Sequence, residues 1–262
     1  MALNVFRESV RDKVLYNLVL FAVLLIGASY FIGQLTAGQD VKIIKDLGLA
    51  ATSIFGLFIA VFIGIGLVSK EVEKRSVYSL LAKPIERYQL LLGKYLGLVL
   101  TLAVNLSVMA GALYAVLAAM IWVGGSEIAR ALERPAVDPF LLEALALTFV
   151  ELAVVTALAL FFSTFSTPIL AAAFTFGLFI AGRFSADLRD FKQVVDAPLA
   201  GFLAQALYWV LPNLAPYDIR AQVVHGQPVT AGYLALVTGY GVLYVAALLL
   251  AAVFIFSRRD FK

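Results

Sequence analysis

Six long apolar stretches, separated by blocks of charged and polar residues, dominate the hydrophobic pattern of this chain. Most are about 20 residues long, the length that an α-helix needs to cross the hydrocarbon core of a bilayer. The pattern therefore predicts an all-α integral membrane protein with one transmembrane domain over residues 1–262. The predicted spans are approximately 15–35, 48–68, 95–122, 140–162, 166–182 and 231–256.

Two further apolar segments are too short to cross a membrane. At the N-terminus, helical spacing places Leu3, Phe6, Val10 and Val14 on one face, which predicts an amphipathic helix at the interface. A second stretch, 198–211, precedes the last span and predicts a re-entrant or interfacial helix on the outer side.

Composition supports lipid as the solvent of this chain. Hydrophobic residues make up 63% and charged residues 14%, against about 25% charged residues in soluble domains, and mean hydropathy is +0.97. These values exclude a soluble enzyme, and the basic groups form no stripe on a soluble face that could bind nucleic acid. The absence of cysteine excludes disulfides and thiolate metal sites.

The positions of Lys and Arg predict the orientation, because basic residues concentrate on the cytoplasmic side of short loops. With both termini inside, the inner side holds 12 basic and six acidic residues. We therefore expect both termini in the cytoplasm and the protein in a bacterial cytoplasmic membrane. The 12 basic residues are Arg7, Arg11, Lys13, Lys70, Lys74, Arg75, Lys83, Arg87, Lys94, Arg258, Arg259 and Lys262.

The inner loop between the second and third spans, residues 70–94, has the most specific pattern. A dense charge cluster is followed by Ser76, which suits the cap of a short helix, and Pro84 ends that helix. A soluble partner that grips such a helix could move both attached spans as rigid bodies. The alternative is an interfacial helix that only seats the loop on lipid headgroups.

In its order of motifs this loop resembles that of ABC-2-type transporter permeases. The motifs are Glu71, Leu80-Leu81, Lys83-Pro84, Arg87 and Gly93-Lys94. Three other segments resemble the entry helix, the outer segment before the last span and the usual ending of these permeases: 6–13, 211–218 and 256–260. Within the family, the chain is most similar to permeases for the maturation of multicopper enzymes such as nitrous-oxide reductase.

The resemblance implies a loop that docks into a separate ATPase subunit, and a second permease copy, either identical or a close paralogue. The expected coupling residues are Glu71, Glu73, Lys74, Arg75, Lys83, Pro84 and Arg87. No cofactor is expected in this chain. A phosphate-binding loop needs Gly five residues before its Gly-Lys pair and Ser or Thr after it. Around Gly93-Lys94 those positions hold Tyr88 and Tyr95, so ATP is expected to bind to the partner.

Glu151 lies near the middle of the fourth predicted span, where a carboxylate costs about 2–3 kcal/mol to insert. It should therefore face protein or water, or carry a proton. Asn105 and Ser107 in the third span, with Thr148 and Thr156 in its own span, are candidate partners. One interpretation is a carboxylate that handles substrate or protons in the translocation path. The other is a neutral side chain bonded to a neighbouring helix or to the dimer partner.

Hydrolytic and acid–base motifs are absent from the sequence. Neither Gly-x-Ser-x-Gly nor His-Glu-x-x-His occurs, and the only histidine is His225, predicted on the outer face. We therefore expect a non-enzymatic permease subunit of an ABC transporter, most simply an exporter. Two alternatives stay open: an ATP-independent carrier or channel that uses Glu151, and a membrane scaffold for an assembly factor.

Overall fold

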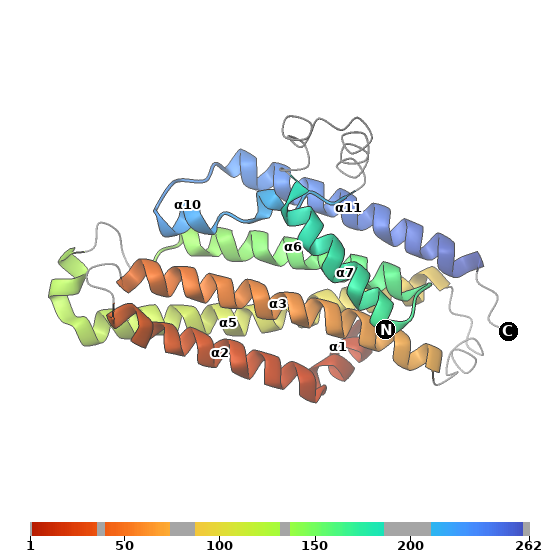
Figure 1. The fold of residues 1–262 in the computed structure, drawn as a ribbon, viewed down its shortest axis with the longest axis horizontal. Helices are drawn as coiled ribbons and strands as arrows, with labels where there is room; N and C mark the ends of the chain where they lie inside the picture. The colour runs from red at the N-terminus through yellow and green to blue at the C-terminus, as the bar shows by residue number, and fades with distance from the viewer. Residues whose placement is uncertain (1, 36–39, 74–86, 132–136, 186–210, 259–262) are drawn as a thin grey trace, which may run out of the picture.

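The computed structural model describes residues 2–35, 40–73, 87–131, 137–185 and 211–258. Within these ranges every regular element is a helix, as the sequence predicts (Figure 1). The elements are α1 (Ala2–Val10), α2 (Lys13–Gln34), α3 (Asp40–Glu73), α5 (Arg87–Ala131), α6 (Phe140–Ser163), α7 (Pro168–Arg183), the 3-10 helix η1 (Ala215–Tyr217), α10 (Arg220–Val224) and α11 (Ala231–Arg258).

Five helices in the described part of the chain are long and apolar enough to cross a membrane: α2, α3, α5, α6 and α11. They correspond to five of the six predicted spans. The remaining one, 166–182, corresponds to α7, whose 16 residues extend about 24 Å, less than the roughly 30 Å of a hydrocarbon core. The all-α membrane fold is confirmed, whereas the six-span layout stays a prediction.

Local sequence explains where several of these helices begin. The Asp12 side chain caps α2 by accepting a hydrogen bond of 3.0 Å from the backbone N–H of Val14. Between α6 and α7 the chain turns through Thr164 to Thr167, and Pro168 then occupies the first turn of α7. Proline suits that position because its missing N–H has no partner in the helix and its φ is already helical.

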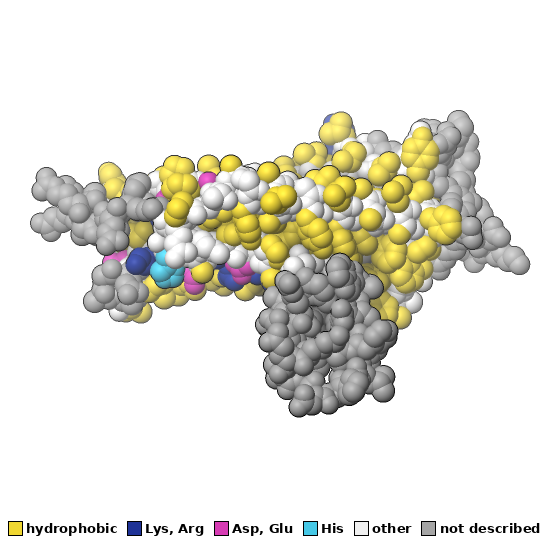
Figure 2. Space-filling model, turned by 90° about the horizontal axis from the view of Figure 1, so that it is seen from above, with side chains coloured by type: hydrophobic (Ala, Val, Ile, Leu, Met, Phe, Trp, Pro, Cys, Tyr) yellow, Lys and Arg dark blue, Asp and Glu magenta, His cyan; other side chains and the backbone are white. Residues whose placement is uncertain are grey.

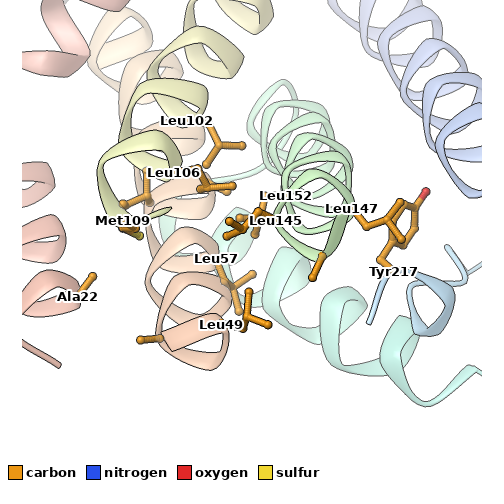
Figure 3. Close-up of a cluster of buried hydrophobic side chains, with 14 of the residues drawn as sticks. Ala22, Leu49, Leu57, Leu102, Leu106, Met109, Leu145, Leu147, Leu152 and Tyr217 are labelled. Carbon is orange, nitrogen blue, oxygen red and sulfur yellow. The ribbon is translucent and has the colours of Figure 1, made fainter. Parts of the chain in front are cut away.

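The centre of the molecule is the contact between α3 and α6. About two thirds of the apolar window of each is buried, against 22–28% for α2, α5 and α11. In Figure 3, leucines of α3, α5 and α6 point toward one another, whereas Leu147 and Tyr217 lie on the other side of α6. Gly64 allows this close approach, because a Cβ there would lie 3.0 Å from the Cβ of Ala159.

The outer surface of the bundle is apolar, as lipid contact requires. Large side chains of α2 and α11 are exposed along most of each helix, and Figure 2 shows such side chains covering much of one face. No aqueous protein would expose so large a continuous apolar area. Examples are Leu20, Phe21, Leu24, Leu236, Leu243 and Leu250.

The helix ends sort to two sides of the bundle. The α1 helix, the last residues of α11, the end of α3 and the start of α5 lie at one end (Figure 1). The end of α2 and the starts of α3 and α6 lie at the opposite end. The helix ends that flank residues 74–86 therefore lie on the same side as α1 and the last residues of α11, which agrees with the predicted relative arrangement.

The predicted N-terminal helix is present as α1, and it packs across α5. Gly97 of α5 admits it, because a Cβ there would lie 2.7 Å from the Ala2 carbonyl oxygen and from Val5. Leu3 and Val14 of the predicted apolar face are exposed, so they are available to lipid. Val14 belongs to α2 rather than to α1, because the helix breaks before Asp12.

Candidate functional site

The structure describes only the borders of the predicted coupling segment. Glu71 and Glu73 lie on the last turn of α3, and Arg87 is the first residue of α5. The other four predicted coupling residues and the expected short helix after Ser76 fall outside the described residues, as does nearly all of the predicted outer helix at 198–211. Those four residues are Lys74, Arg75, Lys83 and Pro84.

A charged junction occupies the middle of the bundle. Glu151 lies halfway along α6 and is 1% exposed. Arg183, the last residue of α7, places Nη2 2.9 Å from Oε2 of Glu151 and Nε 2.9 Å from Oε1. The Nη2–Oε2 contact is a charge-assisted hydrogen bond, which is stronger than a neutral one, whereas the Nε–Oε1 contact is an ion-pair distance without hydrogen-bond geometry.

Two further charges extend this pair. The Nη1 atom of Arg183 donates to Oδ2 of Asp218. Arg220 contacts the same carboxylate twice, with Nε 2.9 Å from Oδ1 and Nη2 2.9 Å from Oδ2. Nη2 of Arg183 also lies 3.5 Å from the hydroxyl oxygen of Ser53 on α3. Two cations and two anions alternate in this network, so its formal charges cancel. We call these five residues the Arg183 network.

In the structure Glu151 pairs with Arg183, and three of its four candidate partners, Asn105, Ser107 and Thr156, bond to carbonyl oxygens of their own helices. Asn105 donates 2.7 Å to the carbonyl oxygen of Thr101, and Thr156 donates 2.8 Å to that of Leu152. Ser107 is exposed and donates 2.7 Å to the carbonyl oxygen of Ala103. Hydroxyl and amide groups bond readily to carbonyls one turn earlier in their own helix, whereas Glu151 needs a donor from elsewhere, and Arg183 supplies it.

Asp218 reaches this position because the chain returns to the end of α7 after residues 186–210. The backbone N–H of Leu214 donates 3.0 Å to the carbonyl oxygen of Gly182. The absence of a side chain at Gly182 permits the contact, since a Cβ there would lie 2.5 Å from the Pro212 carbonyl oxygen. Ser185 also donates 2.8 Å to the side-chain oxygen of Asn213.

From that contact the chain runs antiparallel to α11. The N–H of Asn213 donates 3.0 Å to the hydroxyl of Tyr240, and the hydroxyl of Tyr233 donates 2.7 Å to the carbonyl oxygen of Pro216. Residues later in this segment therefore contact residues earlier in α11. The α7 helix and residues 212–224 together cover the length of α6, with α7 ending beside its midpoint.

A second buried ion pair lies at the end of the bundle away from the termini. Nζ of Lys45 on α3 is 3.4 Å from Oδ2 of Asp138, and both side chains are nearly inaccessible. Asp138 also accepts 3.0 Å from the backbone N–H of Phe140 at the start of α6. Its carbonyl oxygen accepts 3.0 Å from the Tyr114 hydroxyl of α5. This pair therefore joins α3, α5 and α6 independently of α7.

The geometry of the Arg183 network provides charge pairing. Both oxygens of Glu151 face a cation, so the carboxylate is positioned as an anchor and not as a free base. Within the described ranges, no group of three or more His, Asp or Glu side chains could hold a metal ion. What the arrangement can do is fix or release the end of α7 against α6 and α3.

Comparison with known families decides the identity of the chain. A family model described as ABC-2 family transporter protein matches residues 2–261. The chain belongs to the ABC-2 transporter family. No curated protein matches it. Family membership confirms the resemblance drawn from the inner loop and makes the chain a membrane permease of an ABC transporter, a family that works with an ABC ATPase.

Sequence reasoning about this ABC-2 permease did not identify Arg183, Asp218 or Arg220 as site residues. One signal could have found the first of them. The predicted span 166–182 is shorter than a membrane crossing and is followed directly by Arg183. A basic residue at the end of a segment too short to reach the far interface lies at the depth of an intramembrane acid, and Glu151 is the acid at that depth.

Proposed function

We propose that this ABC-2 permease is an exporter subunit that pairs with a second permease copy and is driven by separate ATPase subunits docked on residues 70–94. In this proposal the protein lies in the bacterial cytoplasmic membrane with both termini inside. Export is the direction favoured by the resemblance to permeases that serve multicopper-enzyme maturation. The match to the ABC-2 family over residues 2–261 carries the proposal.

The length of the helices beside the docking segment supports a mechanical role. The 34 residues of α3 extend about 51 Å, well beyond a hydrocarbon core of roughly 30 Å. One continuous helix thus connects Glu73 with the buried Lys45 and Ser53. Force applied near Glu73 reaches the middle of the bundle without passing through a loop. A helix that moves as a rigid body is a common element of transport switches.

The charges of the docking segment fit a polar, releasable interface. Glu71 and Glu73 precede Lys74 and Arg75, and Arg87 opens the next helix. Such adjacent groups of opposite charge favour a specific register with a partner of complementary pattern. Lys83 and Pro84 complete the set of proposed coupling residues, with Pro84 as the stop of the docking helix.

The alternative of an ATP-independent carrier requires Glu151 to accept and release its coupling ion. Its ion pair with Arg183 argues against that role, because a protein cation already occupies the position that a coupling ion would take. The carrier predicts uptake or efflux that follows a proton gradient without ATP. A membrane scaffold predicts neither ATP hydrolysis nor transport.

Purification of the permease in native lipid with its bound proteins tests the proposal. The expected result is a co-purifying ATPase with Walker motifs whose hydrolysis rate changes on reconstitution with the permease. A mutant permease with Lys74→Glu and Arg75→Glu serves as the matched control for docking. Recovery of the permease without any ATP-hydrolysing protein would refute the proposal and leave the carrier and the scaffold.

A further inference from the structure

The contacts of the α7 terminus divide into two groups. The first group ties α7 to the returning segment: the Gly182–Leu214 and Ser185–Asn213 hydrogen bonds and the Arg183–Asp218 ion pair. We call the end of α7 with residues 212–220 the outer unit. These three contacts include a backbone bond, a side-chain hydrogen bond and an ion pair, so we treat the outer unit as one body.

The second group of contacts attaches the outer unit to the rest of the bundle. Toward α11 these contacts are neutral hydrogen bonds through Tyr217, Tyr233 and Tyr240. Toward the central helices the polar contacts are those of Arg183 with Glu151 and Ser53. Among the described residues, Arg183–Glu151 is therefore the one ion pair between the outer unit and α6, and it acts beside the apolar packing of Leu214 and Tyr217 in the core that α6 shares.

The charges of this ion pair favour full contact over partial separation. The outer unit carries Arg183, Asp218 and Arg220, with a formal charge of +1, and α6 carries Glu151, with −1. Separation would leave Glu151 buried without its cation, which strongly disfavours partial opening. An element of this kind is either closed or open and does not deform continuously.

Aromatic side chains also join α3 to α7, the helix that ends in Arg183. Phe58 of α3 and Phe176 of α7 have ring centroids 5.7 Å apart, and Phe62 lies 6.3 Å from Phe176. These rings and the Ser53 contact are where α3 meets α7. A displacement of α3 along its axis therefore acts directly on the position of Arg183.

We propose that the Arg183–Glu151 ion pair is the switchable joint of the permease, which opens when the ATPase moves α3 and thereby releases the outer unit from α6. This inference rests on the proposed function. It assigns Arg183 and Glu151 as positioning residues and gives the network a role beyond stability, namely to keep the outer half of the bundle closed until ATP is used.

A cysteine introduced at Ser53 reports the state of the joint, because the natural chain has no cysteine and Ser53 is 7% exposed. The Ser53→Cys variant is placed with its co-purifying ATPase in lipid nanodiscs and treated with sulfonatoethyl methanethiosulfonate. Labelling follows the open fraction, so we expect it to be roughly tenfold faster during ATP hydrolysis than without nucleotide. A cysteine at Ser29, fully buried on α2, is the control and stays protected.

A second experiment removes the charges of the Arg183–Glu151 pair. Glu151→Gln with Arg183→Gln leaves Asp218 paired with Arg220, so the remaining charges still cancel. In this background the cysteine introduced at position 53 should label at the fast rate without ATP. Lys45→Gln with Asp138→Asn removes the other buried pair, outside the outer unit, and should keep the ATP dependence.

The outcomes separate the inference from the function on which it rests. If no ATPase is bound, the proposed function is wrong. If ATP is hydrolysed but the cysteine at position 53 labels at one rate with and without ATP, the ion pair is not a joint. Slow, ATP-dependent labelling in the charge-free background would equally overturn the inference.

Discussion

Arg183 ends α7 beside Glu151, halfway along α6, so a guanidinium and a carboxylate meet in the part of the bundle where lipid surrounds the helices. An isolated charge at this depth is strongly disfavoured. The pair therefore explains how the chain keeps a carboxylate in a helix that is otherwise almost entirely apolar.

Replacing Arg183 by Gln should destabilise the permease by about 3–5 kcal/mol, because Glu151 would stay buried without a cation. The double variant with Glu151→Gln should recover most of this loss, since no uncompensated charge is then left buried. Thermal unfolding in detergent, followed by intrinsic fluorescence, measures both. Equal loss in the single and double variants would show that the two charges do not interact.

The contact between α3 and α6 depends on Gly64. Substitution by Leu should lower stability by about 1–3 kcal/mol, because added side-chain volume must displace α6 at Ala159. Gly66, two residues later on α3, is the matched control, since a Cβ there meets nothing within 4 Å. The same unfolding assay applies, and a larger loss at Gly66 than at Gly64 would contradict the packing.

Orientation is testable with single cysteines in this cysteine-free chain. We expect a cysteine at Gln227, between α10 and α11, to react with a membrane-impermeant maleimide on intact cells. A cysteine at Ser76 should react only after permeabilisation, because positive residues hold that segment inside. The reverse pattern would invert the protein in the membrane.

Charge reversal at Lys74 and Arg75 should uncouple the ATPase from the permease while the protein still inserts. The reason is that the reversed side chains would then carry the same charge as the ATPase surface that the basic residues are proposed to contact. We expect co-purification to fall and stimulation of hydrolysis to be lost, with unchanged permease yield. Unaltered binding and stimulation would remove these two residues from the coupling surface.

The sequence was sufficient to predict the helices but not the network. Long apolar runs fix where α2, α3, α5, α6 and α11 lie, because only helices satisfy backbone hydrogen bonds in lipid. The pairing of Glu151 with Arg183 joins residues on different helices through tertiary packing. Position along each predicted span suggested Asn105 as the partner of Glu151. Arg183 was not considered, because a full crossing by 166–182 would place it on the outer side of the membrane.

For the inner segment, residues 70–94, the sequence indicated the family but not the role of each residue. Its order of Glu71, Lys83-Pro84 and Arg87 was enough to indicate the ABC-2 family, which the match over residues 2–261 confirms. The helix ends at Glu73 and Arg87 then placed the borders of the segment on one side of the bundle. The roles of individual charges depend on the surface of another subunit, so no property of this chain alone specifies them.

Site-directed cross-linking tests most directly whether an external ATPase drives the permease through residues 70–94. A benzophenone maleimide attached to a cysteine at Ser76 is irradiated in the purified complex, with a cysteine at Gln227 as control. The account predicts an adduct between permease and ATPase from position 76 and none from position 227. An ATPase that cross-links from position 227 but not from 76 would contradict it.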